Sequence, residues 1–197
     1  MGILKKPLLH SLSLEELESV IVAAGFPRYR AMQVWHGLYR HFATNTNEIP
    51  AIPEDLKEFL SASYELTPVM LMEREKSDGS DDTTIKFLLA LTDDETIETV
   101  LIPARMSVEK DLTNDSRLTP VKPKIRNTIC VSSQVGCKFA CSFCASGKAG
   151  YVRNLEAGEI VGQIIEVART LGKLPDNIVF MGVGEPLDNY DNVLSAI

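Results

Sequence analysis

The sequence predicts an α/β protein: an N-terminal helical accessory domain and a β-meander, followed by the start of a partial (β/α) barrel. Three changes of hydrophobic pattern along the 197 residues support this. Apolar residues recur at helical spacing over residues 12–66, alternate with polar ones over 67–103, and follow strand and helix patterns in turn from residue 128. The expected domains are residues 1–66, 67–126 (meander and long linker) and 127–197 (the N-terminal part of the barrel).

The first domain is expected to contain three helices. Ser13 and Glu16 show the capping-box pattern at the start of the first, and Gly25 with Pro27 ends it. Pro53 begins the third. The second helix has a broad apolar stripe, which indicates a core face: Ala31, Val34, Trp35, Leu38, Tyr39 and Phe42.

The meander is expected to have three strands, at residues 69–75, 83–91 and 96–102, separated by acidic turns. In the third strand the side chain of Glu98 shares a face with Val100 and Ile102. A carboxylate in such a position usually lies at an edge or at a solvated end of a sheet.

The barrel segment is expected to begin with a strand at 128–133 and a helix at 155–171 that ends at Gly172. The apolar run 177–181 is typical of a buried parallel strand, and glycines follow it. Ligand-binding loops of such barrels lie at the carboxyl ends of the strands.

Charge is distributed unevenly along the chain, whose net charge is −7. Residues 43–120 carry a net charge of −10, whereas residues 121–153 carry six Lys and Arg and no acidic residue. The positive stretch either attracts an anionic partner or balances bound thiolates. No apolar run approaches the ~20 residues that span a membrane, and no export signal is present, so a cytoplasmic protein is expected.

All four cysteines lie between residues 130 and 144. Four readings apply: small buried residues, a disulfide framework, a structural zinc site, or an iron–sulfur cluster. The spacing Cys137-x3-Cys141-x2-Cys144 favours a [4Fe–4S] cluster on three thiolates, with one iron free of protein ligands. These thiolates are expected to converge on one point.

The triplet, with the aromatic Phe143 before its last cysteine, resembles the radical S-adenosylmethionine (SAM) signature. The longer string Cys130-Val-Ser-Ser-Gln-Val-Gly-Cys137 resembles the adenine C2 methyltransferases of the RlmN type, whose Cfr relatives methylate adenine C8. The resemblance extends through residues 145–155, residues 181–186 and the N-terminal half.

This resemblance implies site residues and cofactors. The cofactors are a [4Fe–4S] cluster on Cys137, Cys141 and Cys144, and SAM, which Gly184 and Glu185 help to bind. Glu98 corresponds to the general base, and Cys130 to the thiol that releases the product by attacking a methylated cysteine. That second cysteine does not follow Cys144 here, so the chain is expected to be the N-terminal portion of a longer enzyme and inactive alone.

The resemblance also implies partners: 23S ribosomal RNA, transfer RNA as a second substrate, and an electron donor such as a flavodoxin or ferredoxin, with no membrane. Basic residues near the second helix then contact an RNA backbone or form a solvated face: Arg28, Arg30, His36, Arg40 and His41. Residues 104–126 are either an RNA contact or a surface insertion. Three other functions stay open: Cfr-like C8 methylation, a radical SAM reaction on another substrate, and a non-catalytic cysteine–metal RNA-binding module.

Overall fold

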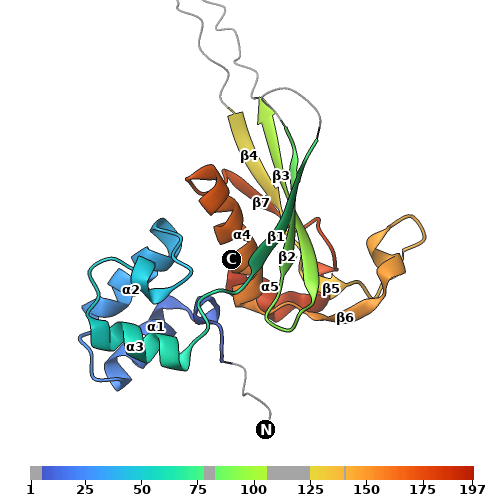
Figure 1. The fold of residues 1–197 in the computed structure, drawn as a ribbon. Coiled ribbons are helices and arrows are strands. Elements are labelled where there is room, and N and C mark those ends of the chain that lie inside the picture. Colours follow the sequence, from blue (N-terminus) through green and yellow to red (C-terminus); the bar gives the residue numbers. More distant parts are fainter. Residues whose placement is uncertain (1–5, 78–82, 106–124, 140) are drawn as a thin grey trace, which may run out of the picture.

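The computed structural model describes residues 6–77, 83–105, 125–139 and 141–197 (Figure 1). Its helices are α1 (Leu14–Ala23), α2 (Tyr29–Arg40), α3 (Glu54–Ser63), α4 (Ala157–Leu171) and α5 (Tyr190–Ala196). Its strands are β1 (Met70–Lys76), β2 (Ile85–Ala90), β3 (Thr96–Arg105), β4 (Ile125–Cys130), β5 (Gln134–Gly136), β6 (Tyr151–Asn154) and β7 (Asn177–Val179). No helix in these described ranges is long and apolar enough to cross a membrane.

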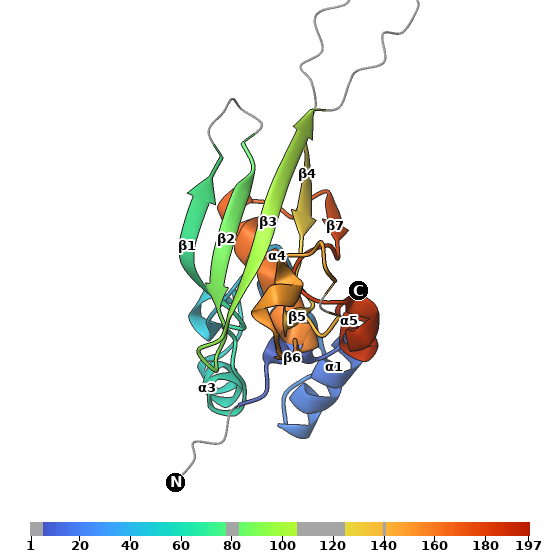
Figure 2. The same cartoon turned by 90° about the vertical axis from the view of Figure 1, so that its right-hand side faces the viewer.

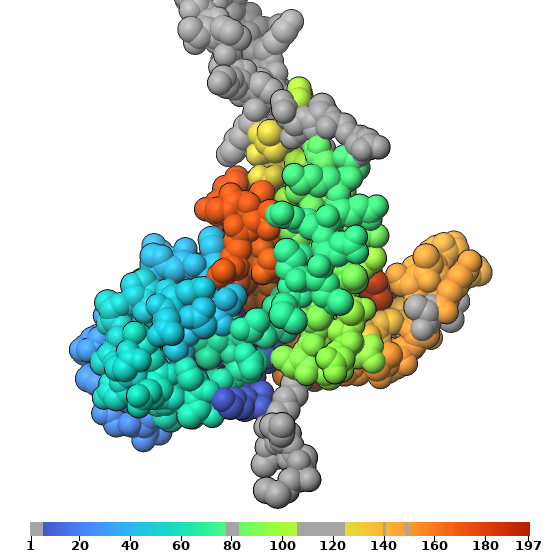
Figure 3. Space-filling model, viewed as in Figure 1, coloured from blue at the N-terminus to red at the C-terminus, as the bar shows by residue number. Residues whose placement is uncertain are grey.

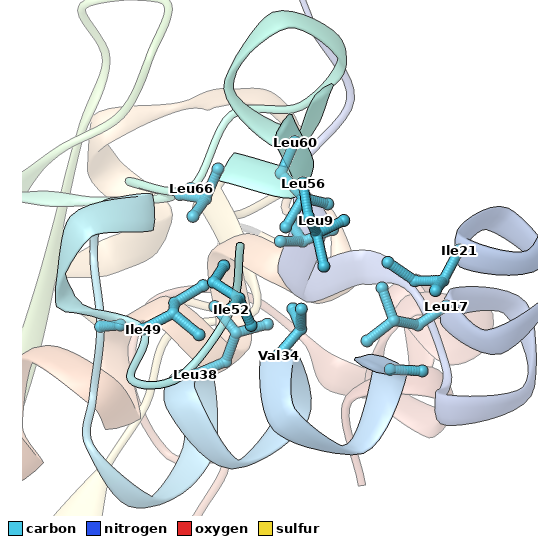
Figure 4. Close-up of a cluster of buried hydrophobic side chains, with 12 residues drawn as sticks. Leu9, Leu17, Ile21, Val34, Leu38, Ile49, Ile52, Leu56, Leu60 and Leu66 are labelled. Atoms are coloured by element: carbon cyan, nitrogen blue, oxygen red, sulfur yellow. The ribbon is translucent and has the colours of Figure 1, made fainter. Parts of the chain in front are cut away.

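The N-terminal helices form a small domain with its own core (Figure 4). The predicted capping box is present, because the Ser13 hydroxyl accepts from the Glu16 amide and the Glu16 carboxylate accepts from the Ser13 amide. The apolar stripe of α2 faces the core from Ala31 to Tyr39, but Phe42, the last residue of the predicted stripe, lies beyond the end of the helix at Arg40 and outside this core. The buried residues of this core are Leu9, Leu17, Ile21, Ala31, Val34, Leu38, Ala43, Ile49, Ile52, Leu56, Leu60 and Leu66.

Five strands form one sheet in the order β1-β2-β3-β4-β7 (Figure 2). The first four strands pair with one another in antiparallel fashion, and β7 pairs with β4 in parallel. The three predicted meander strands are present, and the sheet continues from them directly into the strand expected to begin the barrel. The meander and the barrel segment therefore share one hydrogen-bonded scaffold.

Several predicted boundaries were wrong. Strand β3 extends to Arg105, and β4 begins at Ile125 rather than at residue 128. Pro103 lies within β3 opposite Asn127, although proline lacks the N–H that a strand ladder needs. Residues 106–124, the centre of the unassigned segment 104–126, lie outside the described residues. Strand β7 ends at Val179, and Ile178 is 45% exposed, so this strand is not the buried one predicted.

Helix α4 lies between the helical domain and the sheet (Figure 1). It covers the sheet with Ile160 and Val167, and Gly172 ends it in the left-handed conformation at φ +68°, as predicted. Toward the helical domain, the Gly158 amide donates to the Ser11 hydroxyl at 3.0 Å, and Arg169 donates to the Phe42 carbonyl at 2.7 Å. The helix thereby joins the two cores.

Candidate active site at the cysteine loop

The cysteine loop, residues 137–150, connects β5 to β6 and projects beside the sheet (Figure 3). Strands β5 and β6 pair only with each other. At the base of the loop the Cys137 amide donates to the Gly150 carbonyl at 2.8 Å. Gly136 is required there, because it has φ +71° and an added Cβ would lie 1.9 Å from the Gly150 oxygen. The sequence did not predict this hairpin; it predicted an unbroken strand to residue 133.

The three thiols of the triplet differ in exposure. Cys141 is exposed, while Cys137 and Cys144 are partly buried, and all are free. The Cys144 amide donates to the Cys141 carbonyl at 3.0 Å, which closes a tight turn between them. The backbone amides of Gly147 and Ser146, together with the Ser146 hydroxyl, lower the pKa of the Cys144 thiol. This loop therefore favours a thiolate, the form that binds a metal.

The cysteine loop has the thiol donors that an iron–sulfur cluster needs, but it does not hold them together in a preformed site. Across the described ranges, no group of three His, Cys, Asp or Glu side chains is gathered closely enough to hold a metal ion. The sequence-based expectation that the thiolates converge is thus not met by the fold alone. Three free thiols within eight residues are nonetheless the donors that iron prefers, and metal binding commonly completes the folding of such a loop.

Cys130 occupies a different environment from the triplet. It is the last residue of β4, 9% exposed, and its neighbours in the sheet are Val100 and Val179. Its carbonyl accepts from the Thr99 hydroxyl at 2.8 Å. Burial raises the pKa of its thiol, although the Met181 backbone amide lowers it slightly. Cys130 therefore differs from the triplet in its burial and in its position at the end of β4.

Five buried side chains form a set that we name the polar bridge: Ser132, Ser133, Gln134, Gln163 and Asn189. Gln163 exchanges two hydrogen bonds with the Ser132 backbone, at 2.8 and 2.9 Å. Asn189 donates to the carbonyls of Ser133 and Leu155, both at 2.8 Å. Sequence reasoning missed this set, although the string Ser-Ser-Gln within the motif was a signal that it left without a structural role.

The polar bridge fixes the glycine loop, residues 182–185. The Ser133 amide donates to the Val183 carbonyl at 2.9 Å, and the Val183 amide donates to the Ser132 hydroxyl at 3.0 Å. Gln134 accepts from the Glu185 amide at 3.0 Å. Gly184 has φ +105° and touches the Gln134 side chain, so only glycine fits. The Glu185 carboxylate accepts from the Leu187 amide and caps the following turn.

A cleft of about 450 Å³ lies between β3 and the cysteine loop. Glu98 lines it from β3, Ser146 from the cysteine loop and Val183 from the glycine loop. Glu98 is half exposed and pairs with Lys86 of β2 at 3.5 Å. Cys130, Gly184 and Glu185 do not line this cleft as described. The three cysteines of the triplet do not line it either, so Glu98 is the one predicted site residue among the described lining residues, which include Ala145 and Ser146 next to Cys144.

Comparison with known proteins relates the segment that contains the cysteine loop to one family. Residues 131–197 match the family described as the Radical SAM superfamily. This match covers the C-terminal third of the chain. The match and the similarity to the relatives described next imply a [4Fe–4S] cluster and SAM as cofactors. The three cysteines of the loop supply donors suited to the first of these.

Two curated relatives carry the name dual-specificity RNA methyltransferase RlmN. The protein of Aliarcobacter butzleri is 37% identical over 194 residues, which is 97% of this chain and 50% of the relative. That of Campylobacter fetus is 41% identical over 193 residues, 96% of this chain and 51% of the relative. This chain therefore spans about half the length of the curated relatives it matches.

A solved structure has the same fold. The crystal structure of a radical SAM methyltransferase from Sphaerobacter thermophilus superposes with a TM-score of 0.79 at 38% identity. The match covers 96% of this chain and 50% of that one. The helical domain, the sheet and the first barrel units are thus the start of a radical SAM methyltransferase fold, as the sequence predicted.

Proposed function

We propose that this chain is part of an RNA methyltransferase that transfers a methyl group to adenine C2 in 23S ribosomal RNA, with a transfer RNA adenine as a second substrate. One observation carries the proposal: Glu98 lines the same cleft as Ala145 and Ser146 of the cysteine loop. The names of the RlmN relatives support an RNA substrate. Cytoplasmic RNA fits the four free thiols, which persist in a reducing compartment.

The chemistry explains why these residues are needed. An adenine C2 carbon is neither acidic nor nucleophilic, so polar methyl transfer fails there. When bound, the cluster and SAM supply a carbon-centred radical, which makes attack at C2 possible. Cys137, Cys141 and Cys144 would hold the cluster, and Gly184 with Glu185 would contact SAM. The chain's further task is to take a proton from C2 and to release the product.

Glu98 suits the proton-transfer step. Its carboxylate lines the cleft, and its strand is fixed because the Ser132 hydroxyl donates to the Glu98 carbonyl at 2.6 Å. Lys86 stays cationic, since hydrogen bonding to Glu75 and the charge of Glu98 raise its pKa. The resulting ion pair orients the carboxylate while leaving half of it accessible.

Cys130 suits the release step, in which its thiolate would attack the sulfur of a cysteine that is joined to C2 through a methylene group. The S–S bond would form as the S–C bond breaks, and the departing carbon would take a proton to become the methyl group of the product. Its buried position on β4 keeps it out of the cluster. The target base must leave its stack to enter the cleft. Lys138 and Lys148 of the cysteine loop lie in the positive stretch that favours an RNA backbone. A flavodoxin or ferredoxin would supply the electron.

The test uses an enzyme that carries this sequence and has the full length of its relatives. RNA from a deletion strain should lose 2-methyladenosine, and complementation should restore it, as measured by mass spectrometry. The Glu98→Gln enzyme should still cleave SAM but release at least about 100-fold less methylated RNA, because general-base catalysis contributes that much. Loss of 8-methyladenosine instead would assign the Cfr-type reaction, and unchanged methylation would refute the proposal.

A further inference from the structure

Arg153 has a set of contacts to which the reaction above assigns no role. It lies on β6, three residues after the end of the cysteine loop, with its side chain one-quarter exposed. Its guanidinium donates to both carboxylate oxygens of Glu159, at 2.7 and 2.9 Å, and its Nε donates to Asp93 at 2.7 Å. A single side chain thus joins the hairpin of the cysteine loop to two other elements.

The contact with Glu159 is an anchor. Glu159 lies in the first turn of α4, and its side chain is fully buried. The same carboxylate accepts from the Glu156 amide at 2.9 Å, so it also caps the helix. A bidentate bond to a buried, hydrogen-bonded carboxylate fixes the guanidinium plane. The position of Arg153 is therefore set by α4.

The contact with Asp93 reaches the opposite wall of the cleft. Asp93 lies in the β2–β3 turn, and hydrogen bonding to Arg153 is the largest cause that lowers the pKa of its carboxyl. Three residues later the chain enters β3 and lines the cleft with Thr96, Ile97 and Glu98. A displacement of this turn would thus displace the wall that carries Glu98.

The two walls belong to different sheets, and the Ser132 hydroxyl joins β3 at Glu98 to the β4–β5 segment rather than to the cysteine loop itself. Strands β2 and β3 belong to the five-stranded sheet, whereas β5 and β6 pair only with each other. No strand ladder therefore sets the distance between Glu98 and the cysteine loop among the described residues. A tripod of charge-assisted hydrogen bonds at Arg153 connects both walls to the same helix.

We propose that Arg153 is a positioning residue that holds the Glu98 wall of the cleft at a fixed distance from the cysteine loop, through Asp93 on one side and Glu159 on the other. The inference deepens the proposed function and rests on it. Asp93 is the right residue to change, because its removal leaves the buried Arg153–Glu159 pair intact. Glu54→Gln is the matched control, since it breaks an ion pair with Lys57 on α3.

The first measurement is hydrogen exchange of residues 91–98 in the full-length enzyme with its cluster loaded. Asp93→Asn should raise exchange at this turn about tenfold, because a charged hydrogen bond becomes a neutral one. Asp93→Glu, which keeps the charge, should restore most of the protection, and Glu54→Gln should change nothing there. Unchanged exchange in Asp93→Asn overturns the link, whatever the substrate of the enzyme is.

The second measurement separates the two walls. The 5′-deoxyadenosine formed reports on the cysteine loop, and methylated RNA released reports on Glu98. Asp93→Asn should lower the ratio of methylated RNA to 5′-deoxyadenosine about tenfold, with the loaded iron unchanged. Glu98→Gln should lower the same ratio further without raising exchange at the turn. An equal fall of both products in Asp93→Asn overturns the positioning role. A wild-type enzyme that releases no C2-methylated RNA refutes the proposed function instead.

Discussion

The polar bridge and the cysteine loop include neighbouring segments of the sequence, but they differ in burial and in the hydrogen bonds that stabilise them. Residues 131–135 are all buried, and the side chains of the bridge bond to backbone groups from the β4–β5 segment, the glycine loop and the start of α4. The cysteine loop is mostly exposed, with Phe143 90% exposed, and it is held by a few local hydrogen bonds and by the ion pair of Lys138 with Asp188 at 2.6 Å.

The difference shows which part of the site the polypeptide builds by itself. Buried polar groups that are fully hydrogen-bonded specify one geometry, because every alternative leaves a group unsatisfied. The glycine loop and β4 therefore have fixed positions. The cysteine loop has thiol donors but no packing to gather them, so its final order must come from the metal that they bind.

Loading the metal is the strongest test of this contrast. Anaerobic reconstitution should give a brown protein with about four irons per chain, because three thiolates at this spacing suit a [4Fe–4S] cluster. Ala at Cys137, Cys141 or Cys144 should abolish iron binding. Cys130→Ala should retain it, since this thiol lies on β4, apart from the loop. Iron and sulfide analysis with the visible spectrum measures all four variants.

Two results would contradict the view that the polypeptide orders the polar bridge while the metal orders the cysteine loop. Stoichiometric zinc without sulfide would identify a structural metal site instead. Loss of iron in Cys130→Ala would make this residue a fourth ligand and connect the two regions. Hydrogen exchange adds a check, because loading should protect residues 137–150 while leaving residues 131–135 unchanged.

Breaking the polar bridge should have the next largest effect. Gln134 is fully buried, and its amide contacts the Glu185 amide, Asn154 and Asp188 at 2.7 to 3.0 Å. Gln134→Leu removes all three bonds and leaves the Glu185 amide without its partner. We expect the free energy of unfolding to fall by about 3 kcal/mol, measured by urea denaturation.

The matched substitution in the loop is Cys141→Ser in the metal-free protein. Its side chain is exposed and free, so the free energy of unfolding should change by less than about 0.5 kcal/mol. Comparable losses from both substitutions would show that the loop is as firmly built as the bridge.

Much of the fold was predictable because the local patterns were unambiguous. The capping box of α1, the stripe of α2, the end of α4 at Gly172 and the three meander strands all follow from residue spacing. The errors arose where tertiary context overrides local chemistry. Pro103 lies within β3, paired with Asn127, and β7 is exposed despite its apolar sequence.

The sequence nominated candidate site residues but did not predict how they are arranged. Cysteine spacing singled out the triplet, and resemblance singled out Glu98 and Cys130. No spacing rule, however, places Gln163 against Ser132 or Arg153 against Asp93, because those contacts join segments that are 31 and 60 residues apart. Such long-range polar contacts are decided by the packing of α4, which a pattern along the chain does not specify.

The smallest predicted effect compares two single thiols. The pKa of Cys144 is lowered by the amides of Gly147 and Ser146, whereas burial raises the pKa of Cys130. At pH 8, below the ordinary thiol pKa, Cys144 thus has the larger thiolate fraction, and the thiolate is the nucleophile. Iodoacetamide should alkylate Cys144 at least about tenfold faster than Cys130 in the metal-free protein, as followed by mass spectrometry of the peptides.

The ratio of the two alkylation rates should narrow as the pH rises, because the thiolate fraction of Cys144 saturates first while that of Cys130 still increases. Unfolding in urea should bring the two rates together, since both shifts arise from the folded surroundings. Equal rates in the folded protein at pH 8 would show that the two thiols share one environment.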